Sequence, residues 1–156
     1  IKPGESRYIS GNVLTGNHIA ADGNLGFYHN EISVIPEGKE QEFLGWILPG
    51  LHKFSASKTF LSWLTPSKKY TLNANMHGEE RAYVMTGEYE KVLPMDIFPA
   101  HLIKACMIED IELMENLGIY EVSPEDFALC EFVCTSKIEV QTIIRNALEL
   151  VRKENS

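Results

Sequence analysis

The sequence predicts an α+β chain, because the pattern of its residues changes once along its length. Up to Pro94, β-branched and aromatic runs alternate with Gly, Pro and Asn, which is typical of strands separated by turns. From Ile97 onward, apolar residues recur at helical spacing. We therefore expect a β-rich region at 1–94, followed by a C-terminal helical bundle at 95–156.

The expected strands follow one another through the β-rich region. Each is a short run that is bounded by turn-forming residues. They are Tyr8–Leu14, Gly26–Pro36, Phe43–Leu48, Lys53–Leu64, Tyr70–Met76 and Arg81–Leu93.

The first helical stretch carries one apolar stripe. Its members are Ile103, Cys106, Met107, Ile111 and Met114. Gly118 then occupies a position typical of the residue just after a helix C-terminus. A break near 106–108 would divide this stretch into two short helices, giving three or four in the bundle.

Two further helix starts are predicted from capping signals. Ser123–Asp126 combines an N-cap serine, a proline at the first helical position and early acids, and Ser136–Glu139 has the spacing of a capping box. The last helix should run nearly to Asn155, with Arg152 and Lys153 in its final turn. Its apolar face is Val140, Ile144, Ala147, Leu148 and Val151.

Composition excludes some classes of protein. The 156 residues are 44% hydrophobic and 23% charged, as in globular proteins, and they include no run of about 18 uncharged apolar residues that could span a membrane. The net charge of −8 disfavours a nucleic-acid-binding role, which needs a basic face. Because the chain begins with Ile1 and not with Met, we expect it to be part of a longer polypeptide.

The charge is unevenly distributed. Residues 108–156 hold eleven acids and four bases, whereas 43–78 hold four lysines and no acid. In this basic stretch, aromatic residues lie between the lysines, so it is a candidate surface for a membrane or an acidic partner. The alternative is an ordinary solvated surface whose aromatic side chains lie in the core. The candidate residues are Trp46, Lys53, Lys58, Trp63, Lys68 and Lys69.

Two cysteines have the spacing of half an iron–sulfur motif. Cys130 and Cys134 match the last two ligands of C-x₂-C-x₂-C-x₃-C-P, but the first two positions fall on Pro124 and Phe127. With Cys106 far upstream, the chain has three thiols, and a cubane cluster normally takes four. We interpret the motif as degenerate, with buried inert thiols and Phe127 filling the volume of the lost cluster.

One other function stays open at this stage. Cys106, Cys130 and Cys134 could form a thiol or metal redox module, and an odd number of cysteines is typical of reduced thiols. No catalytic residue and no metal ligand is predicted, since the five histidines show no zinc-binding spacing.

Five segments of the chain carry a family resemblance. They are Ser10–Gly16, Leu25–Gly38, Phe43–Gly50, Glu80–Gly87 and Leu129–Cys134. In this order they resemble the A subunit of the bacterial sodium-translocating NADH:quinone reductases, and the resemblance covers essentially the whole chain. Thr135-Ser136 departs from the Pro-Gly that this family often shows after its second cysteine.

The resemblance implies a fold and a role. It implies part of a β-grasp (SLBB-like) domain within 1–94 and a ferredoxin-type helical domain without a cluster at 95–156. The complex couples NADH oxidation and ubiquinone reduction to sodium export, with flavins and iron–sulfur centres in other subunits. This C-terminal part would hold no cofactor and have no activity alone. It would lie peripherally on the cytoplasmic face of the bacterial inner membrane, bound chiefly to the membrane-embedded B subunit. Alternatively, the chain would bind ubiquinone, with aromatic side chains such as Trp46, Phe54 or Trp63 stacked on the quinone ring.

Overall fold

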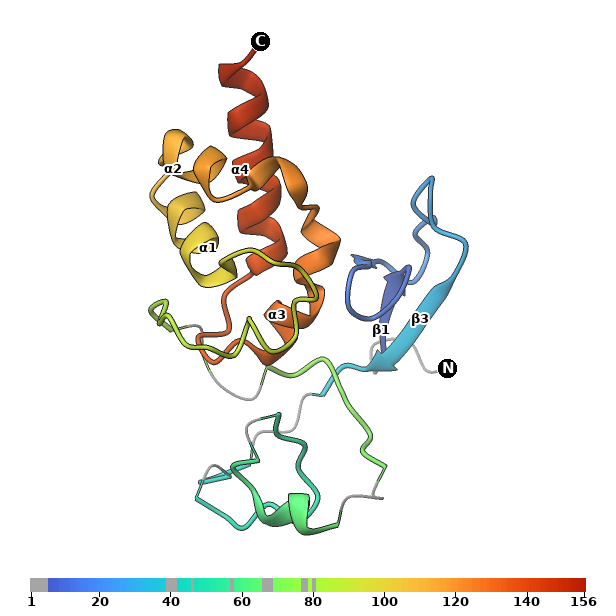
Figure 1. Ribbon diagram of the computed structural model, residues 1–156. Coiled ribbons are helices and arrows are strands. Elements are labelled where there is room, and N and C mark those ends of the chain that lie inside the picture. The colour runs from blue at the N-terminus through green and yellow to red at the C-terminus, as the bar shows by residue number, and fades with distance from the viewer. Residues whose placement is uncertain are drawn as a thin grey trace. The chain divides into compact units, whose positions relative to one another are not determined.

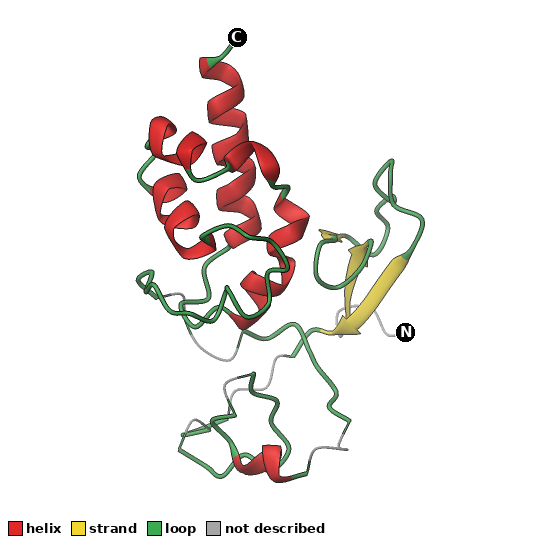
Figure 2. Ribbon diagram, viewed as in Figure 1, coloured by secondary structure: helices red, strands yellow, loops and turns green. Residues whose placement is uncertain are grey.

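The computed structural model describes residues 6–38, 42–45, 47–56, 58–65, 69–76, 79 and 81–156. The chain forms two compact units, Ile1–His77 and Gly78–Ser156. Strands lie in the first unit and the longer helices in the second, which confirms the α+β class (Figures 1 and 2). The β-grasp and ferredoxin-type assignments stay predictions.

A three-stranded antiparallel sheet is the regular part of the first unit. β1 lies in the centre, in the order β2-β1-β3, and its Ile9 pairs with His18 on one side and Ser33 on the other. Ile9 is buried. The strands are β1 (Ser6–Ser10), β2 (Asn17–Ile19) and β3 (Ile32–Pro36).

Strand β1 ends where the backbone turns. Gly11 follows it with a φ of 95°, which side chains rarely tolerate, so the predicted strand Tyr8–Leu14 is confirmed only as far as Ser10. The buried Ser10 Oγ accepts a hydrogen bond from the Gly26 N–H at 2.8 Å and lies 2.7 Å from His29 Nδ1. These bonds join the end of β1 to the loop that leads into β3.

The second predicted strand, Gly26–Pro36, is confirmed only from Ile32. A turn precedes it, closed by a hydrogen bond of 3.0 Å from the His29 N–H to the Gly26 carbonyl. The three-residue strand β2 was not predicted, because so short a segment has no visible alternation.

The strands predicted at Phe43–Leu48, Lys53–Leu64 and Tyr70–Met76 are wrong for the described residues of these segments. The backbone bonds to itself in turns, as from the Ile47 N–H to the Leu44 carbonyl at 3.0 Å. Leu44 also has a φ of 54°, which an extended strand cannot accommodate. Aromatic and β-branched content alone therefore overestimated the sheet.

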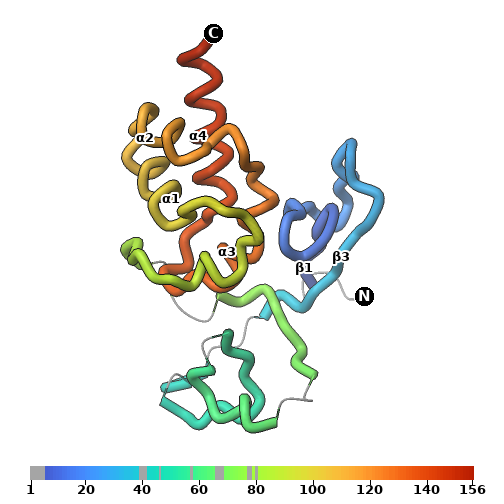
Figure 3. Tube along the Cα trace, in the orientation of Figure 1, coloured from blue at the N-terminus to red at the C-terminus, as the bar shows by residue number. Residues whose placement is uncertain are grey.

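The second unit is a small helical bundle (Figures 1 and 3). Helix α4 packs against α1, α3 and the short helix η3, and α1 packs against α2. The α-helices are α1 (Pro99–Met107), α2 (Ile111–Asn116), α3 (Ala128–Val133) and α4 (Val140–Glu154). Short 3₁₀ helices are η1 (Leu61–Leu64) in the first unit and η2 (Ile119–Glu121) and η3 (Pro124–Phe127) in the second.

The predicted division of the first helical stretch is confirmed. Helix α1 ends at Met107, and α2 begins after Asp110, whose carboxylate accepts from the Leu113 N–H at 3.0 Å. Gly118 follows α2 with a φ of 89°, as expected of a residue beyond the C-cap. Within the predicted apolar stripe, only Met107 is exposed.

The helix start predicted at Ser123–Asp126 is confirmed as the start of η3. The Asp126 carboxylate accepts from the Ser123 N–H at 2.8 Å and from its hydroxyl at 3.0 Å. Pro124 is the first helical residue, where its missing N–H costs nothing.

Helix α4 ends as predicted but begins later. It reaches Glu154, and the predicted face is buried except for the partly buried Leu148. The capping box predicted at Ser136–Glu139 is wrong. Ser136 is buried and binds the chain at 81–84 instead: its carbonyl accepts from the Arg81 N–H at 2.8 Å and its hydroxyl from the Val84 N–H at 3.2 Å.

The strand predicted at Arg81–Leu93 is wrong as well. This segment lines the helical core, where Tyr89 and Leu93 are buried. Tyr83 donates a hydrogen bond of 2.8 Å to the Ala100 carbonyl, and its ring stacks on Tyr89 at 6.3 Å. Residues 81–94 therefore pack with the helices, while the predicted domain boundary after Pro94 remains a prediction.

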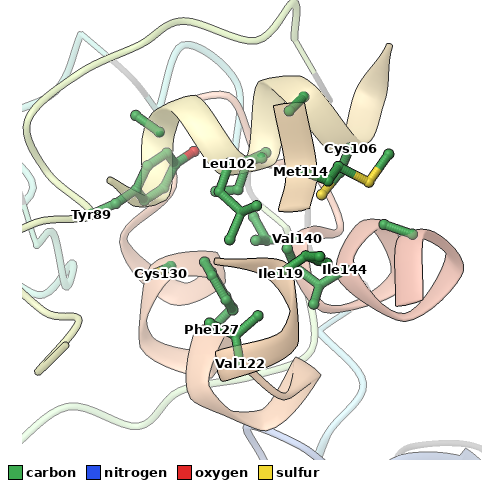
Figure 4. Close-up of a cluster of buried hydrophobic side chains, with 14 of the residues drawn as sticks. Tyr89, Leu102, Cys106, Met114, Ile119, Val122, Phe127, Cys130, Val140 and Ile144 are labelled. Atoms are coloured by element: carbon green, nitrogen blue, oxygen red, sulfur yellow. The ribbon is translucent and has the colours of Figure 1, made fainter. Parts of the chain in front are cut away.

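The main hydrophobic core lies within the second unit (Figure 4). Phe127 is fully buried there, together with Val140 and Ile144 of α4 and Leu102 of α1. Burying such side chains contributes about 1.5–3 kcal/mol each, so this cluster is the main source of stability in the unit.

Replacing Phe127 by alanine should therefore lower the free energy of unfolding by about 3–5 kcal/mol, since the buried ring would leave a cavity. Urea unfolding followed by circular dichroism measures the change. The matched control is Phe132→Ala on α3, where the ring is partly exposed and the loss should be clearly smaller. Equal losses in both variants would contradict the central position of Phe127.

Candidate functional site

The structure describes four of the six predicted surface residues. Lys53, Lys58, Trp63 and Lys69 lie in the first unit, while Trp46 and Lys68 lie outside the described residues. The four have different environments, which decide what each can do.

Lys53 is engaged within its own unit. Its ammonium group forms an ion pair with Glu42, donates to the Gly45 carbonyl at 2.6 Å and lies 5.4 Å from the centre of the Phe60 ring. The Lys53 side chain is only 26% exposed. Its role is to hold the 42–45 turn against Phe60, and it is not a freely accessible cation.

A hydrogen-bonded frame positions η1. The buried Ser62 hydroxyl donates to the Lys53 carbonyl at 2.5 Å, and the Tyr70 hydroxyl donates to the Ser62 carbonyl at 3.1 Å. The Leu61 N–H bonds to the Pro49 carbonyl at 2.9 Å. The frame anchors the polar side of η1 and leaves its apolar side chains facing outward.

Many apolar side chains of this segment face solvent. Trp63 is 51% exposed and Phe43 is 89% exposed, so the alternative in which the aromatic side chains form a core is wrong for them. Phe54 packs edge-on against Tyr70 at 5.7 Å and is still partly exposed. Among the described residues at 43–65, the other large apolar side chains that are exposed are Leu44, Ile47, Leu48, Leu51, Leu61 and Leu64.

Lys58 and Lys69 add positive charge to the same segment. Both side chains are exposed, and the segment 43–76 contains no acidic residue. We call the described residues of 43–76 the apolar–basic segment. It combines the side chains that bind protein or lipid surfaces through both burial and charge.

The three thiols lie in the second unit and are buried. Cys130 on α3 lies in the core beside the residues shown in Figure 4, and Cys134 caps the end of that helix. Cys134 Sγ lies 3.0 Å from the Tyr89 hydroxyl. Burial raises the pKa of the Cys106 thiol to about 11, and burial, followed by the charge of Glu90, raises the pKa of Cys130 to about 11.

This arrangement does not fit an iron–sulfur cluster. Of the four positions in the motif, one is Pro124 and another is the buried ring of Phe127, so two ligands are missing. A raised thiol pKa also opposes the thiolate form that binds metal. Within the described part of the chain, no three His, Cys, Asp or Glu side chains gather into a metal-binding group.

None of the helices in the described ranges has both the length and the apolar composition needed to cross a bilayer.

Among curated proteins, the chain is similar to subunits of a quinone reductase. The relatives are named as the A subunit of the Na⁺-translocating NADH-quinone reductase. The protein of that name from Rhodopirellula baltica is 46% identical to this chain over 150 residues, which cover 95% of this chain and 33% of the relative. The proteins of that name from Yersinia pestis and Vibrio alginolyticus are 41% and 39% identical over 155 residues, covering 99% of this chain and 35% of each relative.

The predicted resemblance to the A subunit is thus confirmed along nearly the whole chain. The chain spans about a third of the length of the curated relatives that it matches. No family model matches the chain.

The thiols should react slowly in the folded protein. At pH 7 we expect little labelling of Cys106 and Cys130 by 5,5′-dithiobis(2-nitrobenzoic acid), and labelling of all three cysteines in urea. Rapid labelling of Cys130 at pH 7 would contradict its burial.

Raising the pH should destabilise the fold. The stability that the neutral thiols of Cys106 and Cys130 contribute is present below pH 9.0 and is lost between pH 9.0 and about 11, because the unfolded chain releases these protons first. Urea unfolding at several pH values measures the free energy of unfolding, and a C106A/C130A variant should lose less stability over this pH range.

Proposed function

We propose that this chain is a structural and assembly part of a Na⁺-translocating NADH-quinone reductase. The similarity of nearly the whole chain to the A subunit supports the assignment to this complex. The complex would couple NADH oxidation and quinone reduction to sodium transport, and the chain would correspond to the C-terminal part of the subunit.

The observation that supports an assembly role is that few large hydrophobic side chains are buried in the first unit. Among its described residues, Ile9 is the one large hydrophobic side chain that is buried, whereas many others are exposed. Monomeric proteins rarely leave extensive apolar surface in water, because each Å² of uncovered apolar area forgoes roughly 25 cal/mol. The apolar–basic segment therefore fits a surface that a partner covers.

For this partner we propose the membrane-embedded B subunit, with the chain attached peripherally at the cytoplasmic face of the membrane. The support is chemical: Lys58 and Lys69 are exposed in the same segment as the exposed Trp63, and this combination of cations and an amphipathic aromatic suits the headgroup level of a bilayer. Lys53 is not part of this contact, because it is held by Glu42.

We further propose that the chain holds no cofactor and is not catalytic by itself. Burial and a raised pKa make Cys106 and Cys130 poor redox thiols, and two of the motif's positions lack a ligand. Flavins and iron–sulfur centres would belong to other subunits. A thiol or metal redox module, or a quinone site around Phe54 and Trp63, would be the competing outcome of the tests below.

Reversing the two exposed lysines should weaken assembly. We expect the K58E/K69E variant of a tagged chain to recover at least fivefold less of the other reductase subunits from detergent-solubilised membranes. The R145E/K153E variant on α4 is the matched control, since it changes the net charge equally. Normal recovery with K58E/K69E would reject the proposed contact, and failure of the unmodified chain to recover any reductase subunit would reject the assignment to the complex.

Protein purified without oxygen should be colourless. We expect less than about 0.1 iron per chain and no visible absorption band, because the chain lacks a full ligand set for a cluster. Titration with a water-soluble quinone should leave the tryptophan fluorescence unchanged. Stoichiometric iron would support the metal redox alternative, and saturable quenching would support the quinone alternative.

A further inference from the structure

A second candidate binding surface lies in the helical unit, apart from the apolar–basic segment. It is a groove of about 370 Å³ between α1, α2 and the segment that carries Met85. Helix α2 contributes Leu113 and, at its C-cap, Leu117, four residues further on.

The α1 side of the groove is a single helical stripe. His101, Lys104, Ala105 and Ile108 follow the spacing i, i+3, i+4, i+7, which places them on one face of the helix and its C-cap. At 1.5 Å per residue, this stripe is roughly 10 Å long. The groove is thus as long as about two turns of a docked helix.

The lining is largely apolar and accessible. Ile108 is 60% exposed and Leu113 is 40% exposed, and Met85 is exposed to a similar extent. Phe98 extends the apolar surface by one turn: it is also exposed, and its ring lies edge-on to His101 at 6.0 Å. Four apolar side chains therefore meet solvent where burial in a complex would be favourable.

The ionisable residues that line the groove are basic, whereas its unit is acidic. Residues 78–156 hold sixteen acids against seven lysines and arginines, but among the described residues that line the groove the ionisable ones are His101 and Lys104. The neighbouring hollow of about 350 Å³ beside α4 is lined instead by Glu109, Glu149, Lys153 and the polar Asn146, together with apolar residues. A basic edge in an acidic unit selects an occupant that carries negative charge.

We propose that this groove binds a segment of another protein chain, one that presents two or three apolar side chains flanked by Asp or Glu. The row of apolar positions suits the i, i+3, i+4 anchors of an amphipathic helix, and Lys104 and His101 would pair with acids at its edge. The identity of the partner rests on the proposed function, in which other reductase subunits surround this chain; the groove itself does not.

Photo-cross-linking in intact cells tests the proposal. The chain carries p-benzoylphenylalanine in place of Leu113, or in place of Ile108 if the first variant does not fold. The control carries it in place of Tyr120, which is exposed on η2 and does not line the groove. We expect an intermolecular cross-link from the groove position, mapped by mass spectrometry to an apolar segment with an acidic residue within four positions, and none to that segment from Tyr120.

The charge at the groove provides the second readout. K104E should lower the yield of this cross-link at least fivefold, and K104R should preserve it, because the positive charge and not the packing of the stem would select the partner. Circular dichroism of each variant confirms that the bundle is folded.

Several results would overturn the proposal: no cross-link from either groove position, a cross-link only within the same polypeptide or to lipid, or a yield that K104E does not change. If the mapped segment belongs to a protein outside the reductase and the unmodified chain recovers no reductase subunit, the groove proposal stands and the proposed function fails. If the other reductase subunits are recovered but no cross-link forms from the groove, the proposed function stands and the groove proposal fails.

Discussion

Burial of Phe127 beside Cys130 is the packing constraint on which the helical unit depends. The ring comes from the last residue of η3 and lies in a core with Val140 and Ile144 of α4. Since α3 begins immediately after Phe127, the same contact sets where Cys130 and Cys134 lie. An aromatic ring at this position supplies, through apolar contact, cohesion that a metal centre would supply through coordination. The Cys130 thiol is then kept neutral by its buried surroundings, which suits packing better than redox chemistry.

The two compact units differ in how they satisfy the hydrophobic effect. In the helical unit, the segment at 81–94 closes over the helices: Tyr89 and Leu93 are buried, and Ser136 binds the backbone at both ends of 81–84. In the first unit, the described turns are held together mainly by polar interactions. Lys53, Ser62 and Tyr70 hold turns together through hydrogen bonds, while Phe43 and Trp63 remain in solvent. A unit of this kind gains stability when another surface covers it.

Charge separates the two proposed contacts from the rest of the chain. The apolar–basic segment is without acids from 43 to 76, and the groove on α1 and α2 presents Lys104 and His101 within an acidic unit. Each site would therefore attract negative charge, although their shapes differ: the first is a series of exposed turns, and the second is a groove about two helical turns long. A chain with two such surfaces can contact two neighbours at once, which agrees with a role in assembly.

The sequence by itself determined the α+β class, the resemblance to the A subunit, and the helices whose signals are local. Ser123 and Gly118 act through hydrogen bonds or backbone angles within a few residues, so their effects can be predicted from their neighbours in the chain. It also predicted buried thiols, because Cys130 shares a helical face with Phe127. Tertiary structure decided the rest. Whether an aromatic run such as 53–64 or 81–93 becomes a strand depends on a partner strand distant in sequence, and Ser136 caps no helix because Arg81 and Val84 already occupy its acceptors. Lys53 likewise resembles the other lysines in sequence, but only folding places Glu42 against it, because the strength of an ion pair depends on distance and burial and not on composition.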